Sequence, residues 1–185
     1  MKKLITATLV CLTLLTASKT FAQPTPNISD TAKRPPLASP RDSIVTTTQG
    51  GVTITMTYGS PAIKGRTIGK NLDPMEDSVW RAGANEATTF EISKDAMIQG
   101  KKLPAGKYAL FTKKHGDQWT LIFNKEWKTW GAYSYKQNMS KDALQVNVSS
   151  PMADDFYHER LKYVIDPNGI VYLFWGHMVV SFTVK

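Results

Sequence analysis

Apolar and polar residues alternate through much of the chain after residue 43. Between Val52 and Tyr58, apolar side chains occupy every second position and threonines occupy the positions between them. The same period of two recurs in residues 119–123, 144–148 and 178–184. Such alternation places one face of a β-strand against a core and the other toward water. These segments are therefore predicted to be half-buried strands.

Turn-forming residues separate the predicted strands. They occur at residues 99–100, 104–106, 115–117 and 167–169, and the last of these turns, Pro167-Asn168-Gly169, is predicted to join residues 160–166 to 170–175 as a hairpin. No segment has a convincing amphipathic helical pattern, although a short helix near residues 73–79 or 136–143 is compatible with the pattern. About nine short strands indicate an all-β fold, either an antiparallel β-sandwich or a jelly-roll-like barrel.

The amino terminus has the pattern of a secretory signal peptide. Lys2 and Lys3 precede an apolar run from Leu4 to Ala17, and cleavage is expected after Ala22. The run is shorter than the ~20 residues that span a bilayer. We therefore predict that residues 1–22 direct export to the periplasm or the extracellular space, with no membrane span after their removal. The single cysteine of the chain lies within this segment, so disulfides and thiolate chemistry are not expected in the mature protein.

Composition divides the rest of the chain into a spacer and one domain. Residues 23–42 contain five of the ten prolines and few aliphatic side chains, which predicts a disordered linker. Residues 43–185 have the usual length of a single domain. Removal of three signal-peptide lysines from 23 basic residues leaves 20 against 15 acidic ones, a net charge of +5. Because the lysines are dispersed, they indicate either a solvated surface or attraction to anionic envelope polymers, and nucleic acid is not expected as a partner.

Four segments carry a resemblance to a known family. They are YGSPAIKGRTIGKNLDPMEDSVWRAGANEATT at residues 58–89, LPAGKYALFT at 103–112, WTLIFNKEW at 119–127 and WGAYSY at 130–135. In this order they resemble the secreted bacterial family catalogued as domain of unknown function 2911 (DUF2911), over residues 40–185. The resemblance implies no activity and no cofactor.

The resemblance centres on the WR-x-GANEAT run, whose small residues predict a tight bend. Such a bend would bring its polar side chains to one concavity, where a small polar ligand or a hydrolytic site could lie. The candidate ligand-binding residues in this run are Trp80, Arg81, Asn85, Glu86 and Thr88. A structural alternative is an Arg81–Glu86 ion pair across the bend. Arg66, in the preceding loop, either presents a planar fork to an anion or pins the loop through an internal salt bridge.

Aromatic and basic residues gather in the next segment. Trp127, Trp130, Tyr133 and Tyr135 lie among three lysines, and they would stack on sugar rings or an envelope polymer if exposed, or fill the end of the fold if buried. Asn124, Trp130 and Tyr133 match the family pattern and are predicted to border the same cavity.

Glu86 is the candidate general acid or base, because a carboxylate desolvated beside a tryptophan would have a raised pKa. Glycoside hydrolysis normally uses two carboxylates, and Glu91, Asp95 and Asp142 are the candidate partners. The three histidines are far apart in the sequence and no metal site is predicted. The chain also contains no G-x-S-x-G elbow, phosphate loop or dinucleotide fingerprint.

Three hypotheses follow from the sequence. The first is a binding module for a small polar or anionic envelope ligand, with a pocket between residues 58–89 and 124–135. The second is an envelope glycan or peptide hydrolase that uses Glu86. The third is a structural or assembly factor without a pocket, in which Arg66, Arg81 and Glu86 are buried and paired with one another.

Overall fold

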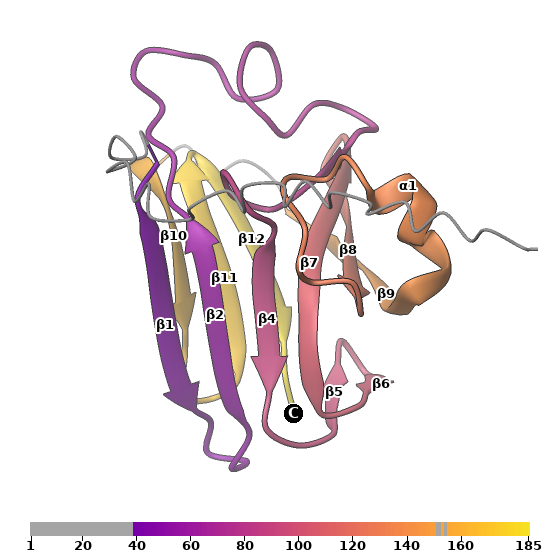
Figure 1. Cartoon of the computed structure of the whole chain (residues 1–185). Coiled ribbons are helices and arrows are strands. Elements are labelled where there is room, and N and C mark those ends of the chain that lie inside the picture. The colour runs from indigo at the N-terminus through magenta and orange to yellow at the C-terminus, as the bar shows by residue number, and fades with distance from the viewer. Residues whose placement is uncertain (1–38, 151–152, 154) are drawn as a thin grey trace, which may run out of the picture. The chain divides into compact units, whose positions relative to one another are not determined.

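The computed structural model describes residues 39–150, 153 and 155–185, and strands make up most of this part of the chain (Figure 1). The predicted signal peptide and most of the predicted linker lie outside the described residues. The strands are β1 (Arg41–Thr47), β2 (Thr53–Gly59), β3 (Val79–Trp80), β4 (Thr88–Ile92), β5 (Ala96–Ile98), β6 (Lys101–Leu103), β7 (Gly106–His115), β8 (Gln118–Asn124), β9 (Asp142–Ser149), β10 (His158–Ile165), β11 (Ile170–Gly176) and β12 (Met178–Thr183). One short helix, α1 (Tyr135–Asn138), continues into a 3₁₀ turn, η1 (Met139–Lys141).

The strands form two antiparallel sheets and a small hairpin. The larger sheet has the order β1-β2-β4-β7-β8-β9, with β3 paired to β7, and the smaller sheet has the order β10-β11-β12. Strands β5 and β6 pair only with each other. In Figure 1 the three strands of the smaller sheet lie behind β1, β2 and β4. The sheets do not close on each other, so the sandwich alternative of the predicted all-β fold is the one observed, and the barrel alternative is not.

The core lies between the two sheets and follows the predicted alternation. Ile54, Met56 and Tyr58 of β2 are buried, while the threonines between them are partly exposed. The buried residues on the facing sides of the two sheets belong to one continuous cluster. The predicted hairpin at residues 167–169 is also confirmed, with Ile165 opposite Val171.

A second, smaller apolar cluster covers the outer face of the larger sheet, which is the face turned away from the smaller sheet. Phe111 of β7 and Ile122 of β8 are buried there against Tyr135 of α1. The Tyr135 ring packs at 5.1 Å from that of Phe111, and its hydroxyl donates a 2.8 Å hydrogen bond to Asp142 Oδ2. Burial, followed by this hydrogen bond, raises the pKa of the Tyr135 hydroxyl. These contacts fix the segment before α1 against the outer face of the sheet.

The structure differs from the sequence prediction in two details. The described residues contain twelve strands where about nine were expected, and the three shortest, β3, β5 and β6, have only two or three residues each. Strands of that length show no alternation in the sequence. Strand β1 begins at Arg41, so the last two residues of the predicted linker, Arg41 and Asp42, are part of the folded sheet.

Residues 60–78 form a long loop at one end of the sandwich (Figure 1). The start of this loop is tied to β10, because Ile63 N donates to Glu159 O at 2.9 Å and Leu161 N donates to Pro61 O at 2.9 Å. Its end is tied to β7 by the hydrogen bond from Asp77 N to Lys114 O, 2.8 Å long. No helix among the described residues has the length and apolar character needed to cross a membrane.

Candidate functional site

The predicted bend follows β3 and packs directly against the end of β2. Ala82 and Asn85 have positive φ angles of 54° and 64°. A Cβ atom added at Gly59 would lie 2.1 Å from the carbonyl oxygen of Ala84, so two backbones meet here without room for a side chain. The small residues of the bend thus allow the two backbones to come this close.

Buried donors hold the inner side of the bend. Thr88 Oγ1 and Tyr163 Oη both donate to the carbonyl oxygen of Ala82, at 2.9 and 2.8 Å, and Trp80 Nε1 donates to Gly83 O at 3.1 Å. Trp80 also stacks on Trp175 of the smaller sheet at 5.8 Å. The candidate ligand-binding residues Trp80 and Thr88 are therefore buried in the core, where they shape the bend.

Asn124 likewise faces the interior. Its Nδ2 donates to Asn138 O at 2.8 Å and to Asp142 Oδ1 at 2.7 Å, and its Oδ1 accepts a hydrogen bond of 2.8 Å from Glu126 N. These bonds use the polar atoms of the fully buried amide. Asn124 fixes the path of the chain as it leaves β8, and it does not line the cleft described below.

The outer side of the bend pairs with the segment before α1. Asn85 O accepts from Gly131 N at 3.0 Å, and Ala87 N donates to Thr129 O at 3.0 Å. Asn85 Nδ2 donates to Ser39 O at 2.8 Å, which places the start of the described chain beside the bend. Asn85 thus joins three segments through its backbone and side chain.

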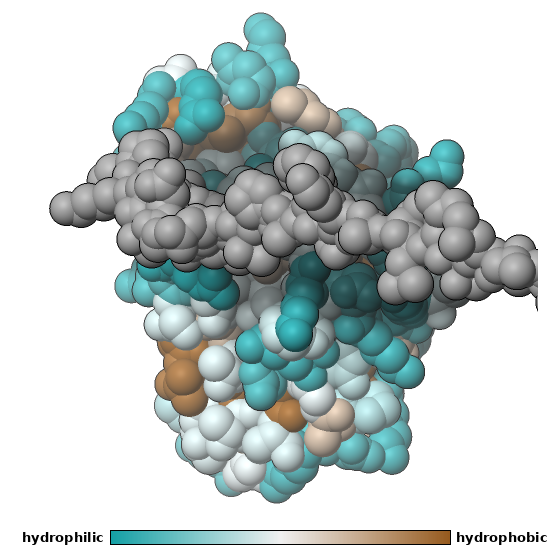
Figure 2. Space-filling model, viewed as in Figure 1, coloured by the Kyte–Doolittle hydropathy of each residue, from teal (hydrophilic) through white to brown (hydrophobic). Residues whose placement is uncertain are grey.

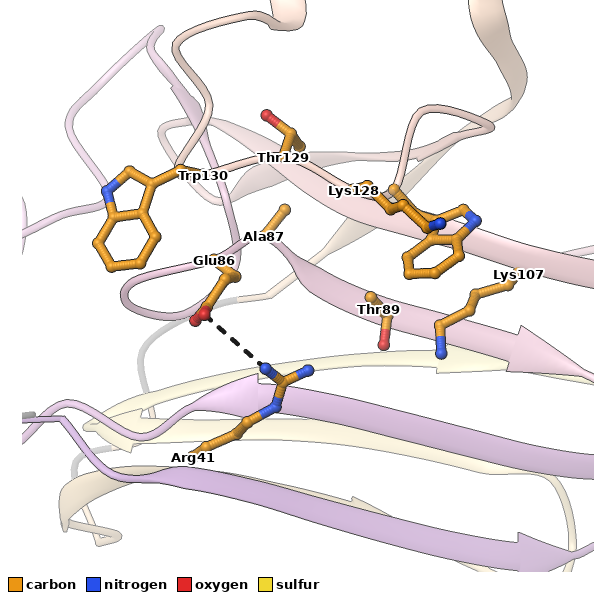
Figure 3. A pocket seen from close by; sticks show the side chains of 9 residues that line it. Arg41, Glu86, Ala87, Thr89, Lys107, Lys128, Thr129 and Trp130 are labelled. Atoms are coloured by element: carbon orange, nitrogen blue, oxygen red, sulfur yellow. Dashed lines mark ion pairs between the residues drawn. The ribbon is translucent and has the colours of Figure 1, made fainter. Parts of the chain in front are cut away.

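A cleft of about 340 Å³ lies between this bend, the outer face of the larger sheet and the segment before α1. The residues around it come from β1, β4, β7 and two connections, and Figure 3 shows them from close by. We call it the cationic cleft, and its lining residues are Arg41, Glu86, Ala87, Thr89, Lys107, Trp127, Lys128, Thr129 and Trp130. The predicted pocket walls, residues 58–89 and 124–135, each contribute part of this lining.

Three cations and one carboxylate line the cationic cleft. Arg41 Nη1 lies 3.8 Å from Glu86 Oε1, and the two side chains are 61% and 48% exposed. In Figure 3 the Arg41 and Glu86 side chains point toward each other, and Lys107 and Lys128 lie on the other side of Thr89 from this pair. A half-exposed pair at this distance is weak, so Glu86 contributes little to holding Arg41 in place.

Lys107 and Lys128 are both placed by Trp127. Their ammonium nitrogens lie 4.8 and 5.0 Å from the centre of its ring. Lys107 Nζ is also 3.2 Å from the carboxylate of Glu91, which is opposite it on β4. Trp130 is 53% exposed, so part of its ring is open to a ligand.

The position of Arg41 depends on how the beginning of β1 is held. Arg41 is opposite Gly59 of β2, and the next residue, Asp42, accepts a 3.0 Å hydrogen bond from Tyr58 Oη. Burial raises the pKa of Tyr58 to about 12, so its hydroxyl keeps the proton that it donates to Asp42 at neutral pH. This bond holds the first residues of β1 against β2, so that the Arg41 side chain lies on the outer face.

Three other candidate residues do not line the cationic cleft. Arg66 is exposed and donates to the carbonyl oxygens of Ala62 and Ile63 in its own loop. Arg81 Nε is buried and has no hydrogen-bond partner among the described residues. Tyr133 is 79% exposed. A Cβ atom added at Gly131 would come within 3.6 Å of both Tyr133 and Arg81, so both side chains lie close to that glycine.

The predicted ion pairs of the three acidic and basic candidates are not observed. Within the described residues Glu86 pairs with Arg41, and Arg66, Arg81 and Glu86 form no ion pair with one another. The scaffold hypothesis required such mutual pairing in a closed interior. The structural alternative of an Arg81–Glu86 bridge is therefore also not what the structure shows.

Glu86 has surroundings unlike those assumed for a general acid. Trp80, the tryptophan expected to desolvate it, is buried in the core, and the Glu86 side chain is 48% exposed. Among the described residues that line the cationic cleft, Glu86 is the one carboxylate. The three candidate partners have other neighbours: Glu91 pairs with Lys107, Asp95 with Lys102, and Asp142 binds Asn124 and Tyr135. The hydrolase hypothesis gains no support from this arrangement.

No group of three metal-ligating side chains occurs in the part of the chain that the structure describes. His115 Nδ1 lies 3.1 Å from Asp77 Oδ2, and His177 Nδ1 is buried without a partner among the described atoms. The absence of a metal site remains a prediction.

Sequence reasoning missed two of the cations. Arg41 lay in the predicted linker, and Lys107 lay within the LPAGKYALFT motif without being singled out. Their separation in the sequence gives no sign that β1 and β7 bring them to the same face. Lys128 and Trp127 were visible as part of the aromatic and basic cluster.

Comparison with known proteins identifies the family. Residues 39–184 match the family described as "Protein of unknown function (DUF2911)", so the chain belongs to this family. No curated protein and no solved structure matches the chain.

Proposed function

We propose that this chain is an exported binding protein whose cationic cleft takes a small anionic ligand built on a ring, such as an acidic sugar unit of an envelope polymer. The observation that carries the proposal is the lining of the cleft. Three cations, Arg41, Lys107 and Lys128, and two aromatic side chains, Trp127 and Trp130, line a space of about 340 Å³. That volume is at the small end of the range for ligand pockets.

The chemistry of the lining favours an anion with an apolar face. Guanidinium and ammonium groups bind carboxylate, sulfate and phosphate through charge-assisted hydrogen bonds. The half-exposed ring of Trp130 offers a surface for stacking on a sugar ring. Export is supported by the sequence of residues 1–22, and an envelope ligand is accessible to an exported protein.

The first test is calorimetric titration with D-glucuronate and D-glucose, which share the sugar ring and differ in the carboxylate. We expect glucuronate to bind more tightly than glucose, with an affinity that falls as salt is added. Arg41→Ala and Lys128→Ala should each weaken glucuronate binding by about fivefold to tenfold, because each removes one charge-assisted contact.

Lys101→Ala is the matched control, since Lys101 is an exposed lysine on β6 that does not line the cationic cleft. It should leave the affinity unchanged. Equal binding of glucose and glucuronate, or an equal loss in the Lys101→Ala variant, would overturn the proposal.

A further inference from the structure

The lining of the cationic cleft divides into two ends. In Figure 3, Arg41 and Glu86 lie together at one end. Lys107 and Lys128 lie on the other side of Thr89. We call the part around Arg41 and Glu86 the arginine end, and the part around the two lysines the lysine end. A ligand that fills the cleft meets both ends, so their difference in charge determines how the ligand is oriented.

The arginine end has no net charge but offers free hydrogen-bonding groups. Arg41 Nη1 lies 3.8 Å from Glu86 Oε1, so a charged ligand group nearby is attracted by one side chain and repelled by the other. This single contact leaves most of the five N–H donors of the guanidinium and of the roughly four acceptor positions of the carboxylate unused. A donor and an acceptor side by side match a hydroxyl group, which both donates and accepts.

Trp130 adds an aromatic surface to the arginine end. Its backbone pairs with that of Glu86 in an isolated antiparallel bridge, and the residue is 53% exposed. Figure 3 shows its ring on the same side of the cleft as Glu86. A ligand ring that carries hydroxyl groups therefore finds an apolar surface and a donor–acceptor pair at the same end of the cleft.

The lysine end has an excess of positive charge. Lys107 Nζ is 3.2 Å from Glu91, which balances part of its charge but does not line the cleft. Lys128 is exposed and has no ion-pair partner among the residues that the structure describes. Within that part of the chain, Lys128 is thus the cation of the cleft whose charge no carboxylate balances.

An uncharged ring gathers the two ammonium groups of the lysine end. The nitrogen of Lys107 lies 4.8 Å from the centre of the Trp127 ring and that of Lys128 lies 5.0 Å from it, so they are no farther apart than the sum of these distances. A cation–π contact restrains a lysine without neutralising it, whereas a carboxylate would do both. An anion that binds Lys128 therefore breaks no ion pair.

We propose that the two ends bind opposite sides of one acidic sugar, an inference that rests on the proposed function. Lys128 binds the carboxylate together with Lys107. Arg41 and Glu86 bind hydroxyl groups of the sugar ring, which lies against Trp130. Glucuronate has this layout, because its carboxylate lies across the ring from two of its hydroxyl groups. The cleft then selects a hydroxylated ring with an acidic group rather than any small anion.

Three probes of similar size separate the two kinds of recognition. D-Glucuronate carries both the carboxylate and the hydroxyl groups, D-glucose lacks the carboxylate, and cyclohexanecarboxylate lacks the hydroxyl groups. Each is titrated into ¹⁵N-labelled protein, and its dissociation constant is obtained from the shifts of the NMR resonances. We expect glucuronate to bind about tenfold more tightly than glucose, which we call the charge preference. It should bind about threefold to tenfold more tightly than cyclohexanecarboxylate, which we call the hydroxyl preference.

Two variants assign the preferences to the two ends. Lys128→Ala should lower the charge preference by about fivefold to tenfold, because it removes the unbalanced cation. It should leave the hydroxyl preference unchanged, since both probes compared there are anions. Arg41→Ala/Glu86→Ala removes one positive and one negative charge, so it should abolish the hydroxyl preference and leave the charge preference unchanged. Lys101→Ala, at an exposed lysine of β6 outside the lining, is the control and should change neither preference.

Two results would overturn this inference and leave the proposed function standing. If the double variant lowers the charge preference as much as Lys128→Ala does, the carboxylate lies at the arginine end. If glucuronate and cyclohexanecarboxylate bind equally well to the unaltered protein, the cleft does not select hydroxyl groups, and this result requires no variant. In both cases glucuronate still binds more tightly than glucose. Equal binding of glucose and glucuronate would instead overturn the proposed function and this inference with it.

Discussion

At the scale of single residues, the bend beside the cationic cleft depends on the absence of side chains at close contacts. The backbone of β2 at Gly59 touches the backbone of the bend at Ala84. Because both partners are main chain, neither can rotate away to make room for an added methyl group. This contact fixes where Asn85 and Glu86 lie relative to the larger sheet.

Gly59→Ala should therefore destabilise the protein by about 1–3 kcal/mol, the usual cost of forcing extra atoms into a packed interior. The free energy of unfolding, measured by urea titration, checks this expectation. Gly50→Ala is the control, because a Cβ atom there has its nearest neighbour at 3.7 Å, and this change should stay within about 0.5 kcal/mol. Equal effects of the two substitutions would show that the contact at Gly59 yields easily.

The same scale shows how far the sequence predicted the candidate site. The motif of residues 80–88 correctly indicated a bend, and Glu86 does line a cleft together with Trp130. The sequence did not show which motif residues face inward. Strand alternation gives that information only where the chain is regular, and between β3 and β4 it turns through positive φ at Ala82 and Asn85.

At the scale of elements, strand register determines what the cationic cleft contains. Arg41 and Lys107 reach the outer face because β1, β2, β4 and β7 are neighbours in that order. Alternation in the sequence predicts that a strand exists and which of its side chains share a face. It does not specify which strand lies beside which, so the fold class could be predicted from the sequence, whereas the meeting of these two cations could not.

Ion pairs with Lys113 and Lys114 and a hydrogen bond with His115 fasten the end of the long loop to β7. Glu76 lies 2.8 Å from Lys114, and Asp77 lies 3.1 Å from His115 and 3.3 Å from Lys113. Hydrogen bonds, first from His115 and then from Lys113, lower the pKa of Asp77, and the hydrogen bond from Lys114 is the main cause of a lowered pKa at Glu76. Folded-state pKa values below the unfolded ones mean that the fastening is complete above the ordinary carboxyl pKa of about 4. It is lost as the pH falls through the lowered values.

The double variant Glu76→Gln/Asp77→Asn should reproduce this loss at neutral pH, because amides cannot form the ion pairs. We expect faster amide hydrogen exchange in residues 60–78 at pH 7, measured by mass spectrometry, with little change in the β-sheet core. Glu126→Gln is the control, since it removes a similar exposed pair with Lys141 elsewhere on the surface. Unchanged exchange in the loop would show that its backbone bonds alone hold it.

At the scale of the whole molecule, the two sheets are not joined to each other by strand pairing. One continuous apolar core lies between them. The surface seen from the side of β1, β2 and β4 shows mostly hydrophilic and neutral residues with a few small hydrophobic areas (Figure 2). The stability of the sandwich therefore comes mainly from apolar contacts between the sheets. Phe182 of β12 is central to them, because its ring lies 5.8 Å from Phe90 and 6.0 Å from Phe123, which belong to the larger sheet.

Phe182→Ala should cost about 3–5 kcal/mol, since it leaves a cavity at the contact of the two sheets. This is a large share of the roughly 5–15 kcal/mol that stabilises a typical domain. Because the core is continuous, near-ultraviolet and far-ultraviolet circular dichroism should follow one shared urea transition in both the variant and the unaltered protein. Met139→Ala, a change at a side chain that is 51% exposed, is the control and should shift the midpoint little. Separate transitions for the two signals would mean that the sheets unfold independently, and a loss below about 1 kcal/mol would mean that other contacts hold them together.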